Sequence, residues 1–131
     1  MRRTGSMYSF VKTYRNIREV LTDRKLASLG DAYINFAYSL ALSNKNGKPS
    51  GEKVKGAALA EALKQSGLRE YLPSRMTKHM LADAAEALIV YAWLSGHITL
   101  IESVGILEKN DELVGSMYQL LVVVKSRIKF S

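Results

Sequence analysis

With 131 residues, 47% of them hydrophobic, the chain has the length and apolar content of one globular domain and is too apolar to stay disordered for lack of a core. It contains no cysteine, which excludes disulfides, thiolate catalysis and cysteine-based zinc sites and is consistent with a cytoplasmic protein. Nineteen Lys and Arg against twelve Asp and Glu give a formal net charge of +7, which favours a polyanionic partner such as nucleic acid. We expect residues 1–131 to form a single domain.

The pattern of apolar residues does not indicate membrane insertion or export. The longest apolar run covers residues 87–94, far fewer than the about 20 residues that a helix needs to cross a bilayer. Residues 1–10 combine two arginines with polar residues and lack the continuous apolar stretch of a secretory signal. Because the basic residues are scattered rather than gathered on one amphipathic segment, the sequence indicates nucleic acid rather than a membrane surface as the partner.

Apolar residues recur at three- and four-residue steps through most of the chain, which is the spacing of one face of an α-helix. In the first half this spacing predicts three helices, over residues 7–21, from Arg24 to the turn-forming segment 43–51, and over residues 54–65. The second of these is apolar over more than one stripe, so we expect it to be central or to serve a partner subunit as well. Gly67 is placed to end the third helix in a left-handed conformation.

The second half of the chain predicts three further helices. Pro73 indicates a break, and Ser74 is placed to be the N-cap of a long helix that ends at Ser95. A shorter helix over residues 98–107 follows, and Asp111 is placed to cap the last one, although a run of three valines inside it favours a strand locally. Because no alternating pattern of the kind that forms a sheet is present, the expected fold class is all-α, a compact bundle of about six helices.

Three acidic residues fall at unusual places on these helices. Asp31 follows Gly30 inside the second predicted helix, and since a mid-helix glycine costs about 1 kcal/mol against alanine, another helix is expected to cross closely there. Asp83 and Glu86 lie three residues apart on one side of the long helix, with His79 one turn before Asp83. No basic residue stands three or four positions from Glu86, so a cation would offset the repulsion between the carboxylates, and such oxygen ligands suit Mg²⁺ or Mn²⁺.

The spacing alone leaves a plainer alternative open. Both carboxylates of the long helix can be solvated surface groups, and His79 is more typical of a helix surface than of a metal ligand, so we leave it out of the candidate site. The tyrosines and Trp93 fall mainly at helical core positions and do not indicate a stacking platform for unpaired bases. The sequence has no phosphate-binding glycine loop, zinc-protease motif or serine-elbow motif.

Two segments together resemble the signatures of the ribonuclease III endonuclease domain. Residues 26–32, Leu-Ala-Ser-Leu-Gly-Asp-Ala, are similar to the first signature, in which Leu-Gly-Asp follows a glutamate. Residues 82–89, Ala-Asp-Ala-Ala-Glu-Ala-Leu-Ile, are similar to the second. In length and pattern the chain looks closest to a compact archaeal branch of this superfamily, with similarities to bacterial Mini-III.

The resemblance implies an all-helical homodimer that uses Mg²⁺ or Mn²⁺ to hydrolyse phosphodiester bonds in double-stranded or structured RNA, leaving a 5′-phosphate and a 3′-hydroxyl. By motif, Asp31, Asp83 and Glu86 would be both the catalytic and the metal-binding residues. We expect no separate domain for binding double-stranded RNA, so the basic surface of this domain would bind it. The residues expected to take part are basic and flank the predicted helices: Lys45, Lys48, Lys53, Arg75 and Lys78.

Two positions depart from the family pattern. The glutamate expected four residues before Asp31 is Ala27, so one carboxylate of the full-length enzymes is missing, although the Mini-III relatives also carry alanine there. Ser28 stands where the longer enzymes place an aromatic residue that anchors the dimer, so the interface would be built differently. Two alternatives therefore stay open beside the endoribonuclease: a catalytically silent relative that binds structured RNA in RNA processing or ribosome assembly, and a structural helical dimer with no RNA role.

Overall fold

The computed structural model describes residues 8–130, and this part of the chain contains six α-helices, one short 3₁₀-helix and no β-strand. The elements are α1 (Ile17–Leu21), α2 (Arg24–Asn46), α3 (Gly56–Gln65), η1 (Leu68–Tyr71), α4 (Lys78–Leu94), α5 (Leu100–Glu108) and α6 (Leu113–Arg127). The predicted all-α fold is therefore confirmed. None of the described helices is long and apolar enough to cross a membrane.

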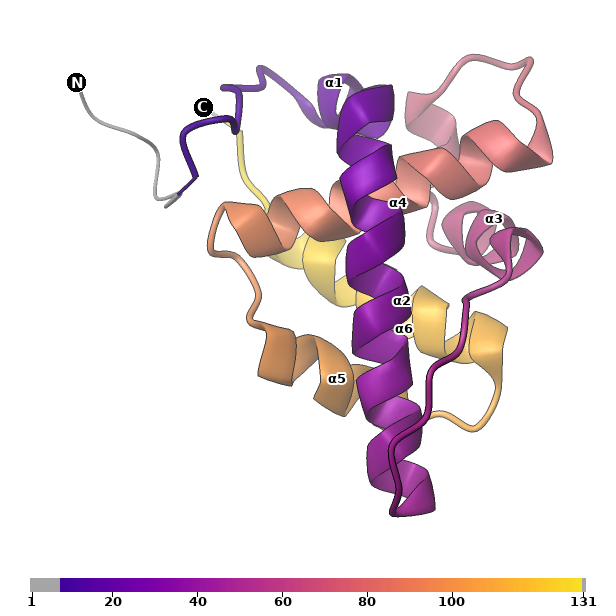
Figure 1. Ribbon diagram of the computed structural model, residues 1–131. Coiled ribbons are helices and arrows are strands. Elements are labelled where there is room, and N and C mark those ends of the chain that lie inside the picture. Colours follow the sequence, from indigo (N-terminus) through magenta and orange to yellow (C-terminus); the bar gives the residue numbers. More distant parts are fainter. Residues whose placement is uncertain (1–7, 131) are drawn as a thin grey trace.

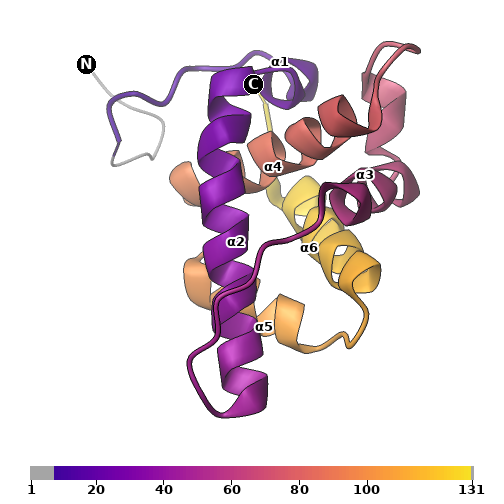
Figure 2. The same ribbon diagram turned by 45° about the vertical axis from the view of Figure 1, so that its right-hand side comes forward.

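Helix α4 forms the centre of the molecule. It is apolar on nearly every side, and residues 84–90 are all buried. It packs against α2 on one side and against α3 and α6 on the other, and Figures 1 and 2 show α2 as a long upright helix that α4 crosses at a steep angle. Any side chain of α4 that faces α2 is therefore withdrawn from water.

The crossing of α2 and α4 is close because Gly30 of α2 lies directly on the main chain of Glu86 in α4. A Cβ atom at residue 30 would collide with the Glu86 carbonyl group and would lie 3.0 Å from the Glu86 Cβ. The two helices thus meet at backbone distance, which only a residue without a side chain permits. The close crossing predicted from the mid-helix glycine is confirmed, and Asp31 stands next to it.

Helix α2 begins at the predicted residue and runs further than predicted. Asp23 is its N-cap, with a side-chain oxygen that accepts hydrogen bonds from two N–H groups of the first turn, both at 3.1 Å. The predicted end before residue 43 is wrong: the helix continues to Asn46 and ends at Gly47, which is left-handed with φ 72°. The polar residues 44–46 are exposed, so the last turn accommodates them on its solvent side.

The first predicted helix is wrong over most of its length. Only α1 is helical, residues 8–16 form turns and irregular chain, and the predicted start at residue 7 lies outside the described residues. Asn16 starts the helix, because its side-chain oxygen accepts an N–H of the first turn at 3.0 Å. The apolar spacing before it reflects packing on α4 instead, as the ring centroids of Tyr14 and Tyr91 lie 5.3 Å apart.

Two predicted N-caps are also wrong. Helix α4 starts after Thr77, whose side chain accepts an N–H of the first turn at 3.1 Å, and not after Ser74, because the chain between η1 and α4 is irregular through residue 77. Helix α6 starts after Glu112 rather than Asp111. The Asp111 carboxylate forms an ion pair with Lys45 at 3.3 Å, so a tertiary partner takes the place of the cap.

Other local features agree with the sequence. Gly67 is left-handed, with φ 83°, one residue after the C-cap of α3, as predicted. Helix α4 ends immediately before Ser95, also as predicted. Helix α5 starts with a capping box in which Thr99 and Glu102 satisfy each other's N–H groups. The three valines at 122–124 are helical within α6 despite their β-propensity, and Val124 is fully buried in the core.

The substitution Gly30→Ala tests the helix crossing. Because the new Cβ would have to displace the main chain of α4 and not a flexible side chain, we expect the free energy of unfolding to fall by about 2–3 kcal/mol or more. Urea denaturation followed by circular dichroism measures it. The matched control is Gly105→Ala in α5, where a Cβ meets nothing within 4 Å and helix propensity predicts a gain of about 0.5–1 kcal/mol. Equal stability of the two variants would contradict the close crossing.

Candidate active site

The crossing of α2 and α4 places Asp31 and Glu86 beside each other. Asp31 follows Gly30, the residue that contacts the main chain of Glu86. Glu86 is 7% exposed and is the one charged residue that is buried in the described part of the chain, whereas Asp31 is exposed. A carboxylate at this depth is costly unless a cation or hydrogen bonds compensate it.

The neighbouring carboxylates change the acidity of Glu86. Burial raises the pKa of Glu86 to about 8, and Asp31, by hydrogen bonding and charge, and Asp83, by charge, raise it in the same direction. No Lys, Arg or His between residues 8 and 130 forms an ion pair with Glu86. The protein therefore holds a buried acid among like charges, an arrangement that is frequent at functional sites.

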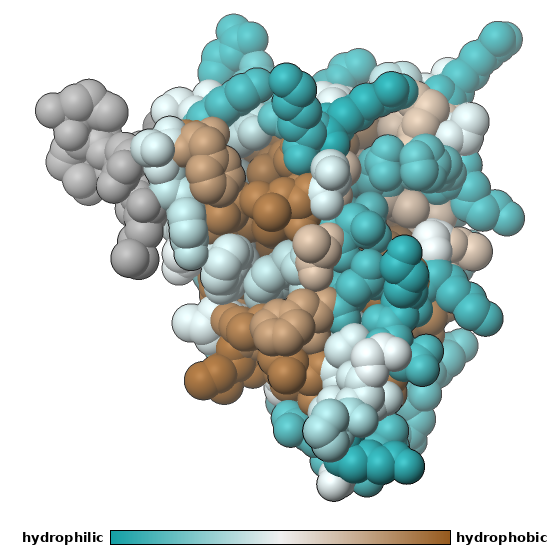
Figure 3. All heavy atoms as spheres, viewed as in Figure 1, coloured by the Kyte–Doolittle hydropathy of each residue, from teal (hydrophilic) through white to brown (hydrophobic). Residues whose placement is uncertain are grey.

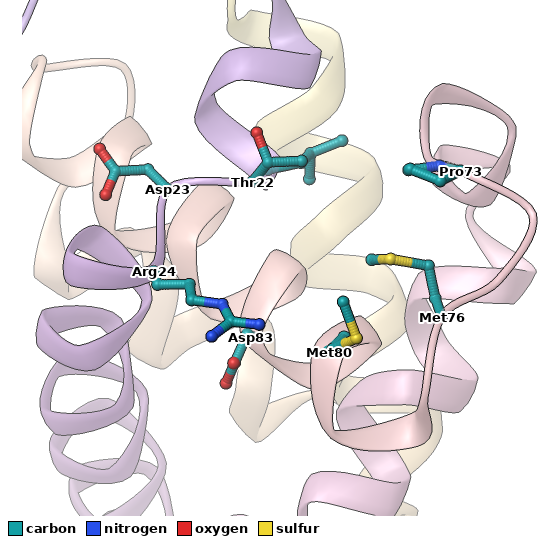
Figure 4. A pocket seen from close by; sticks show the side chains of 8 residues that line it. Thr22, Asp23, Arg24, Pro73, Met76, Met80 and Asp83 are labelled. Atoms are coloured by element: carbon teal, nitrogen blue, oxygen red, sulfur yellow. The ribbon is translucent and has the colours of Figure 1, made fainter.

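Asp83 lies one turn before Glu86 on α4, at the wall of a pocket. Its side chain is 27% exposed, and its Oδ2 lies 3.6 Å from Nε2 of His79, whose side chain is 85% exposed. The pocket has a volume of about 130 Å³ and is formed by the start of α2 and the segment that leads into α4, with Arg24 and Met80 among its lining residues (Figure 4). His79 thus lies on the surface and contacts Asp83 only from outside.

Asn35 belongs to the same candidate site, although its spacing alone did not single it out. Its Nδ2 donates to Oδ1 of Asp31 at 3.2 Å, and its own Oδ1 accepts the N–H of Val54 at 2.7 Å. Asn35 therefore ties the Asp31 carboxylate to the chain between α2 and α3. Its position four residues after Asp31, on the same side of the helix, was the signal available in the sequence.

The three predicted carboxylates gather at the crossing without forming a closed set of ligands. Within residues 8–130, no three His, Asp or Glu side chains converge closely enough to hold a metal ion. The donor chemistry nevertheless fits a hard cation, because Asp31 and Glu86 interact without a compensating positive charge. Mg²⁺ is usually bound through one or two carboxylates and keeps several waters, so two neighbouring carboxylates are a donor set that would suit it.

Comparison with known proteins decides the family. A family model described as Ribonuclease III matches residues 24–120, which extend from the first residue of α2 into α6 and include both helices of the crossing. The chain belongs to the ribonuclease III family. A search of curated proteins finds no match. Membership confirms the resemblance drawn from the two signatures and indicates RNA as the class of partner, while the likeness to a compact archaeal branch stays a prediction.

The basic residues expected to bind RNA fall into two groups on this ribonuclease III domain. Lys45, Lys48 and Lys53 lie at the C-terminal end of α2 and in the loop after it, and Arg75 and Lys78 lie at the opposite end of the molecule, where α4 begins (Figure 1). The Lys45 ammonium group is held in the turn between α5 and α6 by a hydrogen bond of 2.9 Å and an ion pair of 3.3 Å. The other four are exposed and form no ion pair in the described part, so they remain predicted RNA contacts.

The raised pKa of Glu86 makes the stability of the metal-free ribonuclease III domain depend on pH. The pKa of Glu86 is about 8 in the folded protein, whereas its ordinary value is 4.5. Well below pH 4.5 the carboxyl group is therefore protonated in both the folded and the unfolded state, and between about pH 4.5 and 8 only the folded state keeps the proton. Stability conferred by this group is therefore fully present below about pH 4.5, decreases as the pH rises toward the folded pKa, and is lost above about pH 8. The free energy of unfolding of Glu86→Gln should not show this decrease, and above about pH 8 it should exceed that of wild type by roughly 1–3 kcal/mol.

Urea unfolding in the presence of EDTA, repeated across this pH range, measures the difference. The control is Glu70→Gln in η1, an exposed carboxylate that forms no ion pair in the described part. It should follow the wild-type pH profile. Parallel profiles for wild type and Glu86→Gln would show that the buried carboxylate does not interact as described.

Proposed function

We propose that this protein is a metal-dependent endoribonuclease that hydrolyses phosphodiester bonds in double-stranded or structured RNA. The observation that carries the proposal is the buried Glu86 carboxylate, held against Asp31 by a crossing that requires Gly30. Like charges at this depth are unfavourable in the protein alone, and a divalent ion would offset their repulsion. Membership of the ribonuclease III family supports RNA as the substrate class.

In this proposal Asp31 and Glu86 hold Mg²⁺ or Mn²⁺, and Asp83 assists from the preceding turn of α4. When bound, the ion would neutralise charge on the phosphate and make water a better nucleophile. Residues of the chain itself position the carboxylates, since Gly30 sets the distance between the helices and Asn35 donates a hydrogen bond of 3.2 Å to the Asp31 carboxylate. Ion binding requires the Glu86 carboxyl group to lose its proton. In-line hydrolysis would leave a 5′-phosphate and a 3′-hydroxyl.

A duplex suits the described surface better than an unpaired strand. Several aromatic rings contact one another, with centroids 5.1 Å apart for Tyr33 and Trp93 and 6.2 Å apart for Tyr91 and Phe130. Rings engaged in this way are poor platforms for stacking bases. The net charge of +7 supplies phosphate contacts that do not depend on base identity, so binding should weaken steeply between about 50 and 200 mM salt.

The exposed apolar side of α2 supports the homodimer. Leu29 and Phe36 are 40% and 55% exposed, and their seven-residue spacing places them on one side of the helix. Ile101 of α5 is 84% exposed, and Figure 3 shows hydrophobic side chains gathered where α2 and α5 lie. Asp31 projects from the other flank of α2, so a partner on this side would leave the carboxylates open to RNA. With Ser28 in place of an anchoring aromatic, Phe36 would supply the anchor.

A catalytically silent RNA-binding relative is the second candidate, and Ala27 favours it. This residue replaces the glutamate of the full-length enzymes and is 3% exposed, so the core side of α2 carries an apolar group where they carry a ligand. Such a protein would bind structured RNA in RNA processing or ribosome assembly without cutting it. A structural dimer with no RNA role gains no support from the ribonuclease III match.

The variant Glu86→Gln separates these candidates. It keeps the size of the side chain and removes the charge that a hard cation needs, so cleavage of a perfect RNA duplex in Mg²⁺ or Mn²⁺ should fall by at least about 100-fold. Gel analysis of a labelled duplex measures cleavage, and fluorescence anisotropy measures binding. RNA affinity and oligomeric state should not change, because the Glu86 side chain is buried.

Equal cleavage by wild type and Glu86→Gln would show that the proposed site is wrong. If wild type binds the duplex and cuts it in neither metal, the silent RNA-binding protein is the better description. The control Glu70→Gln should cut as wild type does, since it removes one exposed carboxylate away from the α2–α4 crossing.

The oligomeric state tests the proposed dimer. Wild type should show twice the chain mass of 14.6 kDa by light scattering at tens of micromolar protein, and Phe36→Ser should shift the mass toward that of one chain. Because Phe36 is already more than half exposed, its loss should leave folding intact. The control is Tyr71→Ser in η1, which removes another exposed aromatic residue outside α2. A monomeric wild type would rule out the dimer.

A further inference from the structure

A concave, basic surface surrounds the first turn of α2. An open groove of about 530 Å³ is lined there by Lys12, Arg24 and Lys25 together with two acidic residues. Arg24 also lines the smaller pocket of about 130 Å³ that Asp83 borders, so the groove and the pocket adjoin at Arg24. The surface therefore leads from the basic residues to Asp83, one turn before Glu86 on α4.

The acidic side chains in this groove are already engaged, whereas two of its cations are not. Glu19 is paired with an arginine four residues earlier at 2.8 Å. Asp23 accepts a hydrogen bond from the Tyr14 hydroxyl at 2.6 Å and caps α2 with its other oxygen. Arg24 and Lys25 are exposed, and their side chains form no ion pair or hydrogen bond within residues 8–130. The groove therefore offers free positive charge to an anion.

Arg24 stands at a defined distance from the candidate site. It lies seven residues before Asp31, which places both on the same flank of α2, two turns or about 10 Å apart along the helix axis. Figure 4 shows its side chain extending from the start of α2 toward the side of the pocket that Asp83 forms. A polyanionic strand is repelled by the three carboxylates, and Arg24 is a cation without an ion pair in the described part that lines the same pocket as Asp83.

Resting on the proposed function, we propose that Arg24 binds the phosphate of the RNA strand next to the one that is cut, and that Lys25 continues this contact along the groove. A guanidinium group binds phosphate through two parallel N–H donors, so it fixes the orientation of the group as well as attracting its charge. Arg24 thereby sets the register of the strand over Asp31 and Glu86. It is a substrate-binding residue and takes no part in breaking the bond.

Binding of a fluorescein-labelled RNA duplex tests this contact without depending on cleavage. Anisotropy is measured in EDTA for wild type, Arg24→Gln, Arg24→Lys and Lys109→Gln. Lys109 is exposed at the end of α5 and forms no ion pair in the described part, so its removal changes the net charge equally but away from the groove. Arg24→Gln should weaken binding about tenfold and lower the slope of log affinity against log salt by about 1, with Arg24→Lys between it and wild type. Lys109→Gln should change affinity by less than about twofold.

A neutral linkage in the RNA locates the phosphate. In a duplex that the protein cuts at one position, a single methylphosphonate next to the cut should raise the wild-type KM about tenfold and should raise that of Arg24→Gln no further, because the same contact is already lost. If the methylphosphonate raises the KM of Arg24→Gln by the same factor as it raises that of wild type, Arg24 contacts a different phosphate and the proposal is overturned.

The two proposals fail in distinguishable ways. If wild type cuts RNA while Arg24→Gln retains the wild-type affinity and KM, the endoribonuclease stands and the Arg24 contact is overturned. If neither protein cuts RNA but Arg24→Gln loses affinity about tenfold, the Arg24 contact is supported as that of a silent RNA-binding protein. Equal losses for Arg24→Gln and Lys109→Gln overturn it, since net charge alone would then explain binding.

Discussion

The contact between Gly30 and the main chain of Glu86 determines where the acidic groups of this molecule can lie. Helices with larger residues at their crossing are held about 8–10 Å apart by the side chains between them. Here no side chain intervenes on α2, so the carboxylates on the two helices come within interacting distance. Because α4 is surrounded by α2, α3 and α6, Glu86 cannot turn away into solvent. The close crossing therefore accounts both for the burial of Glu86 and for its proximity to Asp31.

If the proposed function holds, this geometry would link folding to ion binding. Burial and neighbouring charges keep a proton on Glu86 at neutral pH, so the metal-free protein avoids a buried negative charge. An ion that takes the place of that proton would stabilise the folded chain by an amount set by its concentration and affinity. The groove at the start of α2 adds a second electrostatic element, positive where the crossing is negative. A polyanion that is attracted at one point and repelled at the next has a preferred position along the surface.

Features that depend on local spacing were predictable from the sequence, and features that depend on distant partners were not. Helical periodicity predicts the all-α class, and together with a glycine in the middle of a helix it predicts the crossing at Gly30 and the grouping of the three acidic residues. The apolar residues before α1 have helical spacing and so predict a helix, yet the rings of Tyr8 and Tyr14 in this irregular segment contact α4, far along the chain. Asn35 was missed because its second partner, Val54, is brought near only by the loop after α2. The N-cap at Asp111 failed for the same reason, since Lys45 holds that carboxylate.

The hydrogen bond from Tyr14 to Asp23 is part of the folded structure but lies outside the residues that match the ribonuclease III family. The ribonuclease III match begins at residue 24, one position after Asp23, which caps the helix that carries Asp31. At the other limit, Leu121 and Val124 lie beyond the match and are fully buried in the core. A fragment trimmed to the matched residues would start with an uncapped helix and leave an open core. Transfer of this site to another scaffold, or deletion mapping of it, must therefore carry flanking chain that the family comparison does not mark.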